Sequence, residues 1–184
     1  MDSKQPRITV CIPHWQVQQY MTICLRSIRK HSEKYDLQVI VVDNGSKDDS
    51  LDYLRGLDWI LLLERPDEVH TNFPWNVFTA WDHGLAHATG DFFVTMHSDV
   101  FVRADGWLDP MLREIQVSPS VAGAGAWKLH LEHPAYALQK RVTRYVTKRV
   151  KKALGMKKIA EWKIGHYPRD YCAMYRTDVI GQNN

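Results

Sequence analysis

The length, composition and charge of the sequence are those of one ordinary soluble globular domain. Its 184 residues are 45% hydrophobic and 24% charged, with a formal net charge of +3, which is a balance that lets a chain bury one sizeable core. A membrane-spanning segment is excluded, because the longest aliphatic run, residues 60–63, is far too short to cross a bilayer.

Alternating strand-like and helix-like segments indicate an α/β fold. ITVCIP (residues 8–13) reads as a first strand that ends at a proline, and helical periodicity follows over residues 20–28. LQVIVV (residues 37–42) is a continuous apolar run, as in a parallel strand covered on both faces. The further expected elements are a helix at 48–57, a strand at 59–63, a helix at 76–87, a strand at 92–96, a helix at 108–115 and strands within 120–127 and 170–175. This order predicts a Rossmann-like, doubly wound, mostly parallel sheet with helices on both faces.

The chain is expected to form a single domain over residues 1–184, because no repeat or linker interrupts it. Its N-terminal residues lead directly into a strand-like run, which argues against a signal peptide. The three cysteines are widely spaced, and Cys11 and Cys24 lie in apolar patterns. We therefore expect reduced core thiols and a cytoplasmic location.

The positive charge belongs to one segment. Nine of the 24 Lys and Arg residues lie within residues 140–158, which contain no acid, and the remaining 15 are outnumbered by 21 acidic residues. Val142, Tyr145 and Val150 recur there at helical spacing, so a basic amphipathic helix is expected. Such a helix either contacts the inner face of an anionic membrane peripherally or packs on the domain with its charges in water. Nucleic-acid binding is not expected, because this is the only basic segment and acidic residues outnumber basic ones in the rest of the chain.

Two polar clusters follow predicted strands. VVDNGSKDDS places Asp43 and Asn44 at the end of the second strand, and His97, Ser98 and Asp99 follow the strand at 92–96. Open parallel sheets bind ligands at the carboxyl ends of their strands. Gly45 and Ser46 alone fit ordinary turn and capping roles. Asp43 precedes the turn, where a buried carboxylate needs a specific partner.

Four segments in this order resemble a known family. VCIPHW, VVDNGSKDDS, AWDHGLAHATGDFFVTMHSDV and YCAMYRTDVI are similar to the landmarks of family 2 glycosyltransferases of the GT-A fold, over roughly residues 8–181. The resemblance implies metal-dependent transfer of a sugar from a nucleoside-diphosphate-sugar donor to a hydroxyl acceptor, such as a lipid-linked acceptor or a cell-envelope polysaccharide. A non-catalytic nucleotide-sugar-binding domain and a nucleotidyltransferase remain alternatives. The second of these usually carries a glycine-rich basic loop where this chain reads PHWQVQQ.

The resemblance also implies which residues bind the donor and the metal. Asp43 would accept a hydrogen bond from the N–H of a nucleobase, since an ionised carboxylate is an acceptor only. Asp99 would bind Mn²⁺ or Mg²⁺, hard cations that prefer carboxylate and phosphate oxygens. His97 stands where the family has a carboxylate, so it is a metal ligand, a phosphate contact or a strand cap. The residues expected around the nucleotide are Pro13, His14, Asp43, Asn44, Ser46, Asp82 and Ser98.

Two further departures from the family pattern and one histidine pair leave roles open. Trp81 and Asp82 replace a usual Arg-Asn pair, so Asp82 either bonds the donor or is a solvated helix residue. The family's catalytic base lies beyond a segment like YCAMYRTDVIGQ; the chain is expected to lack that C-terminal part, and we assign no base. His83 and His87 have a zinc-compatible spacing without the accompanying glutamate, which favours a structural role.

Overall fold

The computed structural model describes residues 5–68, 72–126 and 171–181, together with isolated positions between 138 and 149. The chain divides into two compact units, one made of residues 1–126 and 168–184 and the other of residues 127–167. The account below concerns the first unit. The predicted basic helix at 140–158 lies largely outside the described residues and stays a prediction, as does the single domain over 1–184.

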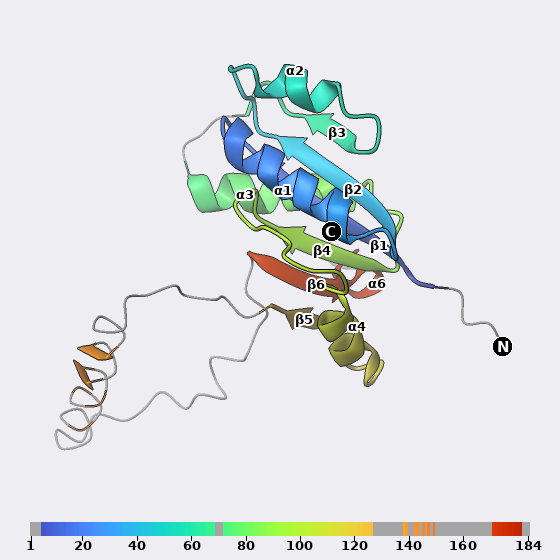
Figure 1. Cartoon of the computed structure of the whole chain (residues 1–184), viewed down its shortest axis with the longest axis vertical. Helices are drawn as coiled ribbons and strands as arrows, with labels where there is room; N and C mark the ends of the chain where they lie inside the picture. Colours follow the sequence, from blue (N-terminus) through green and yellow to red (C-terminus); the bar gives the residue numbers. More distant parts are fainter. Residues whose placement is uncertain are drawn as a thin grey trace. The chain divides into compact units, whose positions relative to one another are not determined.

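The described residues form one six-stranded mixed sheet with the strand order β3-β2-β1-β4-β6-β5 (Figure 1). β3, β2, β1 and β4 are parallel to one another, and β6 is antiparallel to both β4 and β5. The predicted mostly parallel α/β sheet is therefore confirmed. The strands are β1 (Arg7–His14), β2 (Asp36–Asp43), β3 (Leu61–Glu64), β4 (Phe92–Met96), β5 (Gly123–Gly125) and β6 (Cys172–Arg176).

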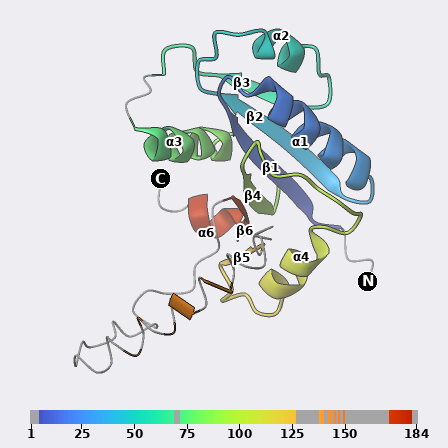
Figure 2. The same cartoon turned by 60° about the vertical axis from the view of Figure 1, so that its left-hand side comes forward.

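Helices cover both faces of this sheet, because the central strands are apolar on both sides. Ile8, Val10 and Ile12 of β1 point into one core, where α1 and α4 pack, whereas Cys11 points into a second core against α3. Figure 2 shows α1 and α3 on opposite sides of the sheet. The helices are α1 (Gln18–His31), α2 (Ser50–Arg55), α3 (Phe73–Leu85), α4 (Asp109–Gln116) and α6 (Thr177–Ile180).

Local capping and pairing set element boundaries that differ from the predicted ones. α3 begins three residues before the expected start, because the Asn72 side chain accepts a hydrogen bond from the Trp75 backbone N–H and a proline occupies its first turn. α2 begins only at Ser50, whose N–H and hydroxyl both donate to the Asp48 carboxylate. β3 begins at Leu61, where pairing with β2 starts.

The last two strands of the sheet pair across a long sequence gap. Gly125 of β5 lies opposite Ala173 of β6, and the Ala126 N–H donates to the Cys172 carbonyl at 3.0 Å. The chain therefore leaves β5 and returns to β6 at neighbouring positions. The strand expected over 120–127 is limited to three residues, where the two backbones pair.

Candidate functional site

The predicted site residues other than Asp82 lie at or directly after the carboxyl ends of three adjacent parallel strands. β1 lies between β2 and β4, so His14 at the end of β1 is flanked by Asp43 at the end of β2 and by the residues that follow β4. Asp43 and His14 are register partners in the β1–β2 pair. The sheet order thus brings together residues that are more than fifty positions apart in the sequence.

The Asp43 side chain holds the tight loop of residues 43–46 together. Its side chain is only 1% exposed, and its two carboxylate oxygens accept hydrogen bonds from the Ser46 backbone N–H at 2.9 Å and the Ser46 hydroxyl at 2.5 Å. Gly45 makes the turn possible, with φ of +74° in the left-handed region, and a Cβ there would be crowded at 3.1 Å from the Pro66 carbonyl oxygen. Each carboxylate oxygen keeps a second lone pair, so Asp43 retains the capacity to accept from a ligand.

Ser46 joins this loop to the end of β1. Its hydroxyl oxygen accepts a hydrogen bond from the Gln16 backbone N–H at 3.0 Å while its hydroxyl proton goes to Asp43. The Asn44 N–H donates to the His14 carbonyl at 2.8 Å. Ser46 therefore connects the loop after β2 to the loop after β1. At the start of α2 it is Asp48, not Ser46, that accepts the hydrogen bonds.

Arg65, which the sequence analysis did not single out, holds the Asn44 side chain in place. Its guanidinium donates to the Asn44 side-chain oxygen at 2.8 Å and to the Thr79 hydroxyl at 3.1 Å, and it pairs with Glu68 at 2.5 Å. The Arg65 backbone N–H also donates to the Asp43 carbonyl at 2.8 Å. The loop after β3 thus supports the loop after β2.

His14 is a buried imidazole at the centre of the edge. It is 1% exposed, and neither ring nitrogen has a hydrogen-bond partner among the described residues. Burial lowers the pKa of His14 below its ordinary value, although the nearby carboxylates of Asp43 and Asp48 act in the opposite direction. His14 is thus neutral at pH 7. Pro13, beside it, is half-buried.

The cluster after β4 presents one carboxylate to solvent. Asp99 is exposed, whereas His97 and Ser98 are half-buried. The His97 ring lies edge-on to the Trp81 ring, with 5.4 Å between the centroids, and its Nε2 is shielded from solvent. The sequence departures at positions 81 and 97 therefore contact each other. No signal in the sequence alone links them.

The side chains after β4 fit a divalent cation that is coordinated partly by the protein and partly by substrate phosphates. In the described part of the chain, no three His, Cys, Asp or Glu side chains gather into a group that could hold a metal. Mg²⁺ and Mn²⁺ are commonly bound by only one or two carboxylates together with substrate phosphates. An exposed Asp99 at a strand end suits that mode, and the assignment of Asp99 and His97 as metal ligands stays a prediction.

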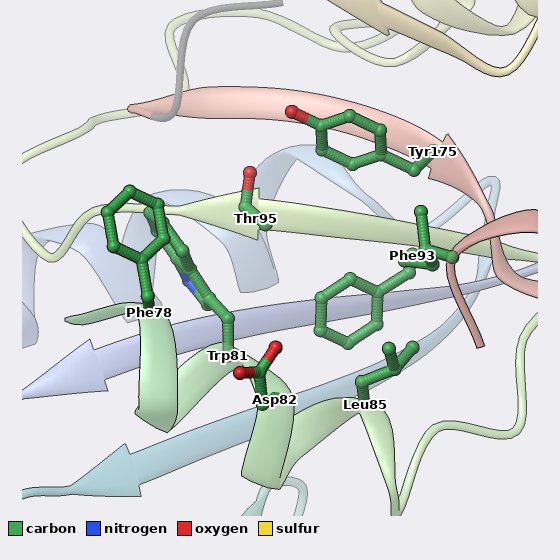
Figure 3. A pocket seen from close by; sticks show the side chains of 8 residues that line it. Phe78, Trp81, Asp82, Leu85, Phe93, Thr95 and Tyr175 are labelled. Carbon is green, nitrogen blue, oxygen red and sulfur yellow. The ribbon is translucent and has the colours of Figure 1, made fainter. Parts of the chain in front are cut away.

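Asp82 lines a cavity that the residues of the Asp43 loop do not line. It is exposed on α3 and lines a cavity of about 220 Å³ on the sheet face that α3 covers (Figure 3). None of Pro13, His14, Asp43, Asn44 or Ser46 lines this cavity. The rings of His83, on α3, and His87, in the turn after it, lie edge-to-face with 5.2 Å between their centroids. Among the described residues, no third metal-binding side chain groups with them.

Comparisons with known proteins agree with this arrangement. The six-stranded mixed sheet with helices on both faces is that of a GT-A fold. The profile of Glycosyl transferase family 2 matches residues 9–182, and the chain belongs to this family.

Solved structures that resemble the chain share its fold. Mannosyltransferase PcManGT from Pyrobaculum calidifontis, in complex with GDP-Man and Mn²⁺, is 20% identical with a TM-score of 0.69, covering 99% of this chain and 48% of that one. Glucosyl-3-phosphoglycerate synthase from Mycobacterium tuberculosis, in complex with UDP, is 16% identical with a TM-score of 0.59, covering 95% of this chain and 58% of that one.

Curated proteins also match this chain. One of them is the dolichyl N-acetyl-alpha-D-glucosaminyl phosphate 3-beta-D-2,3-diacetamido-2,3-dideoxy-beta-D-glucuronosyltransferase of Methanococcus voltae, 25% identical over 122 residues, which are 64% of this chain and 38% of the relative. The chain thus spans about two fifths of this relative and about half of the mannosyltransferase.

Proposed function

We propose that the protein transfers a sugar from a nucleoside-diphosphate-sugar donor to a hydroxyl group of an acceptor, with a divalent cation held at Asp99. Family membership supports the reaction class. The observation that carries the proposal is the buried Asp43 carboxylate, which is fixed by Ser46 at the sheet edge that Asp99 shares.

The Asp43 loop would bind the nucleotide. A carboxylate that is already oriented by two hydrogen bonds loses little conformational freedom when it accepts a third from a base N–H. Uracil and guanine both present such an N–H, and the structural relatives hold UDP and GDP-Man respectively. His14 and Pro13 would line the same pocket, and Asn44 would support the loop. The nucleobase of the donor must therefore carry an N–H group that can donate a hydrogen bond to Asp43.

Asp99 and the donor phosphates would together hold Mn²⁺ or Mg²⁺. When bound, this cation neutralises the charge that develops on the departing nucleoside diphosphate. Ser98, half-buried beside Asp99, would contact the donor at the same edge. The exposed position of Asp99 leaves it free to reach a phosphate-bound cation without rearrangement of the strand.

The acceptor would be a carbohydrate or a lipid-linked saccharide, as in the assembly of a cell-envelope polysaccharide. The name of the Methanococcus voltae relative specifies a dolichyl-linked substrate. The nine Lys and Arg residues of segment 140–158 would favour contact with an anionic membrane that carries such an acceptor. Among the described residues, no helix combines the length and apolar character that crossing a bilayer requires.

Calorimetric titration with UDP-, GDP- and dTDP-sugars tests the proposal directly. We expect one of the three to bind in the presence of Mn²⁺, and binding to weaken by about tenfold or more when Mn²⁺ is removed, because the phosphate charge is then uncompensated. Failure of all three donors to bind would contradict the proposal. A preference for a nucleoside triphosphate would indicate a nucleotidyltransferase, and binding without transfer or hydrolysis would indicate a non-catalytic module.

Arg65→Met is expected to weaken binding of that nucleotide by about tenfold. The substitution keeps the aliphatic stem but removes the hydrogen bonds to Asn44 and Thr79 and the ion pair with Glu68. The loop then loses its support on one side. Arg55→Met is the matched control, since Arg55 forms exposed ion pairs with Asp52 and Glu64 at α2. Equal nucleotide affinity of the Arg65 variant and the wild type would show that the loop needs no such support.

A further inference from the structure

Two histidines one helical turn apart stand at the end of α3. His83 lies in the last turn of the helix and His87 in the turn that follows, and both residues are exposed. Their rings are in edge-to-face contact, with 5.2 Å between the centroids and 61° between the planes. Because both residues are exposed, a role in core packing does not account for the pair.

The separation of the two rings fits shared coordination of one metal ion. Zn²⁺ binds histidine nitrogens at about 2.0–2.1 Å, in tetrahedral geometry. A ring nitrogen lies about 1 Å from the centroid of its imidazole, so two imidazoles on one tetrahedral Zn²⁺ have centroids about 5 Å apart. The 5.2 Å between His83 and His87 is close to this value. Side-chain rotation alone can therefore bring both rings onto one ion, without a change in the helix.

The hydrogen bond of the His87 ring leaves its other nitrogen ready to bind a metal. The His87 Nδ1 lies 3.0 Å from the His83 carbonyl oxygen. A carbonyl oxygen only accepts, so this hydrogen bond places the ring proton on Nδ1 and the free lone pair of the neutral ring on Nε2. Histidines that bind metals almost always donate their other ring N–H to a carbonyl, a carboxylate or water, which fixes the tautomer and the orientation of the ring.

The backbone at His87 is anchored to the sheet. The Gln38 side-chain amide donates to the His87 carbonyl at 3.0 Å. The Gln38 side-chain oxygen accepts hydrogen bonds from the Thr9 hydroxyl at 2.7 Å and from the Thr89 N–H at 2.8 Å and hydroxyl at 2.9 Å. A ligand that is already ordered loses little conformational freedom on binding. We therefore expect the pair to bind a metal more tightly than two unrestrained histidines would.

The surroundings of His83 favour its neutral form, which is the form that binds metals. Partial burial lowers the pKa of His83 below its ordinary value, and His87 and Arg65 act in the same direction. The Arg65 guanidinium is paired with the Glu68 carboxylate at 2.5 Å, so its charge opposes a bound cation only weakly.

The histidine pair is distant from the sheet edge that carries the candidate nucleotide site. Its anchor Gln38 lies near the start of β2, and Asp43 is the last residue of the same strand. From position 38 to position 43 a strand advances about 16 Å, at about 3.3 Å per residue. The ligand chemistry also differs, since imidazole suits Zn²⁺ and Cu²⁺ whereas Mg²⁺ and Mn²⁺ prefer oxygen.

We propose that His83 and His87 form a zinc-binding site at the end of α3, in which the two imidazoles chelate one Zn²⁺ and water or an anion completes the coordination. The ion would join the last turn of α3 to the turn that follows it. This site goes beyond the proposed sugar transfer and does not depend on it.

Titration of the whole chain with Zn²⁺ alone, followed through the histidine ring signals in ¹H–¹⁵N spectra, tests the site. The two signals are assigned by their loss in His83→Gln and His87→Gln. We expect both signals of the wild type to shift together and to saturate in the micromolar range. In each single variant the remaining signal should need about tenfold more Zn²⁺ or higher, because one imidazole alone cannot chelate.

Two controls make the titration specific. His31→Gln removes a half-buried imidazole that is hydrogen-bonded to Asp105, and it should leave the shifts of the pair unchanged. Mg²⁺ at the same concentration should shift neither signal, because it prefers oxygen ligands.

Three results would overturn the inference. They are ring signals that stay in place up to millimolar Zn²⁺, equal shifts with Mg²⁺ and Zn²⁺, and a His83 signal that saturates at the same Zn²⁺ concentration in His87→Gln as in the wild type. The last result would mean that the imidazoles bind singly. The titration uses no nucleotide, so its failure is distinguishable from absent nucleotide binding, which would contradict the proposed function instead.

Discussion

Asp99→Ala is expected to abolish the effect of Mn²⁺ on nucleotide binding and to lower the rate of sugar transfer by about a thousandfold. Asp99 is the exposed carboxylate of the cluster after β4. Without it the cation would be held by the donor phosphates alone, and the charge on the leaving group would be poorly compensated. The measurements are calorimetric titration with and without Mn²⁺ and electron paramagnetic resonance of free Mn²⁺.

Two further variants make this prediction specific. Asp58→Ala removes an exposed acid at a distance from the sheet edge and should leave Mn²⁺ dependence unchanged. His97→Ala distinguishes metal ligation from packing. If His97 is a direct ligand, the variant loses Mn²⁺ affinity as Asp99→Ala does. If His97 only packs on Trp81, the variant instead has a lower free energy of unfolding. Unaltered Mn²⁺ dependence in Asp99→Ala would remove Asp99 from the metal site.

Gly84→Ala is expected to destabilise the fold by about 2–3 kcal/mol. A Cβ at position 84 would lie 2.3 Å from the Cys11 sulfur, since α3 packs directly on β1 there. In the variant Cys11→Ala the sulfur is absent, and the remaining neighbours of the new methyl group lie at 3.5 Å. The double variant should therefore recover most of the loss, with a coupling energy of about 1–3 kcal/mol in urea unfolding.

Gly56→Ala is the matched control for the packing effect. Gly56 has an ordinary backbone conformation, and its nearest neighbour for a Cβ would be a carbonyl oxygen at 3.4 Å. Its replacement should change the free energy of unfolding by less than about 1 kcal/mol. Additive effects of Gly84→Ala and Cys11→Ala would contradict the close approach of α3 to β1.

The parallel half of the sheet could be predicted from the sequence because its strands are continuous apolar runs. Residues 39–42 are apolar on both faces, and this part of β2 is covered on both faces. The same reasoning placed Asp43 and Asp99 after strands, and thus at one edge. The antiparallel direction of β6 could not be predicted, since a single short strand carries no signal of its direction or of its neighbours.

The support of the site could not be predicted because it depends on contacts between distant loops. Arg65 reaches Asn44 only when the chain segments after β2 and β3 lie together. The cavity beside Asp82 combines α3 with two strands, one of them from the end of the chain. Trp81 and His97 meet for the same reason. Sequence motifs identify residues that follow strands, but not the tertiary contacts that orient them.

The pairing of β5 with β6 makes residues 127–167 dispensable for closing the sheet. Gly125 and Ala173 are register partners, and opposite residues of an antiparallel pair lie about 5 Å apart at their Cα atoms. A turn of a few residues is sufficient to bridge that gap. The segment between these two strands can therefore be lengthened, shortened or exchanged in evolution while the pairing of β5 with β6, and with it the edge of the sheet, is kept.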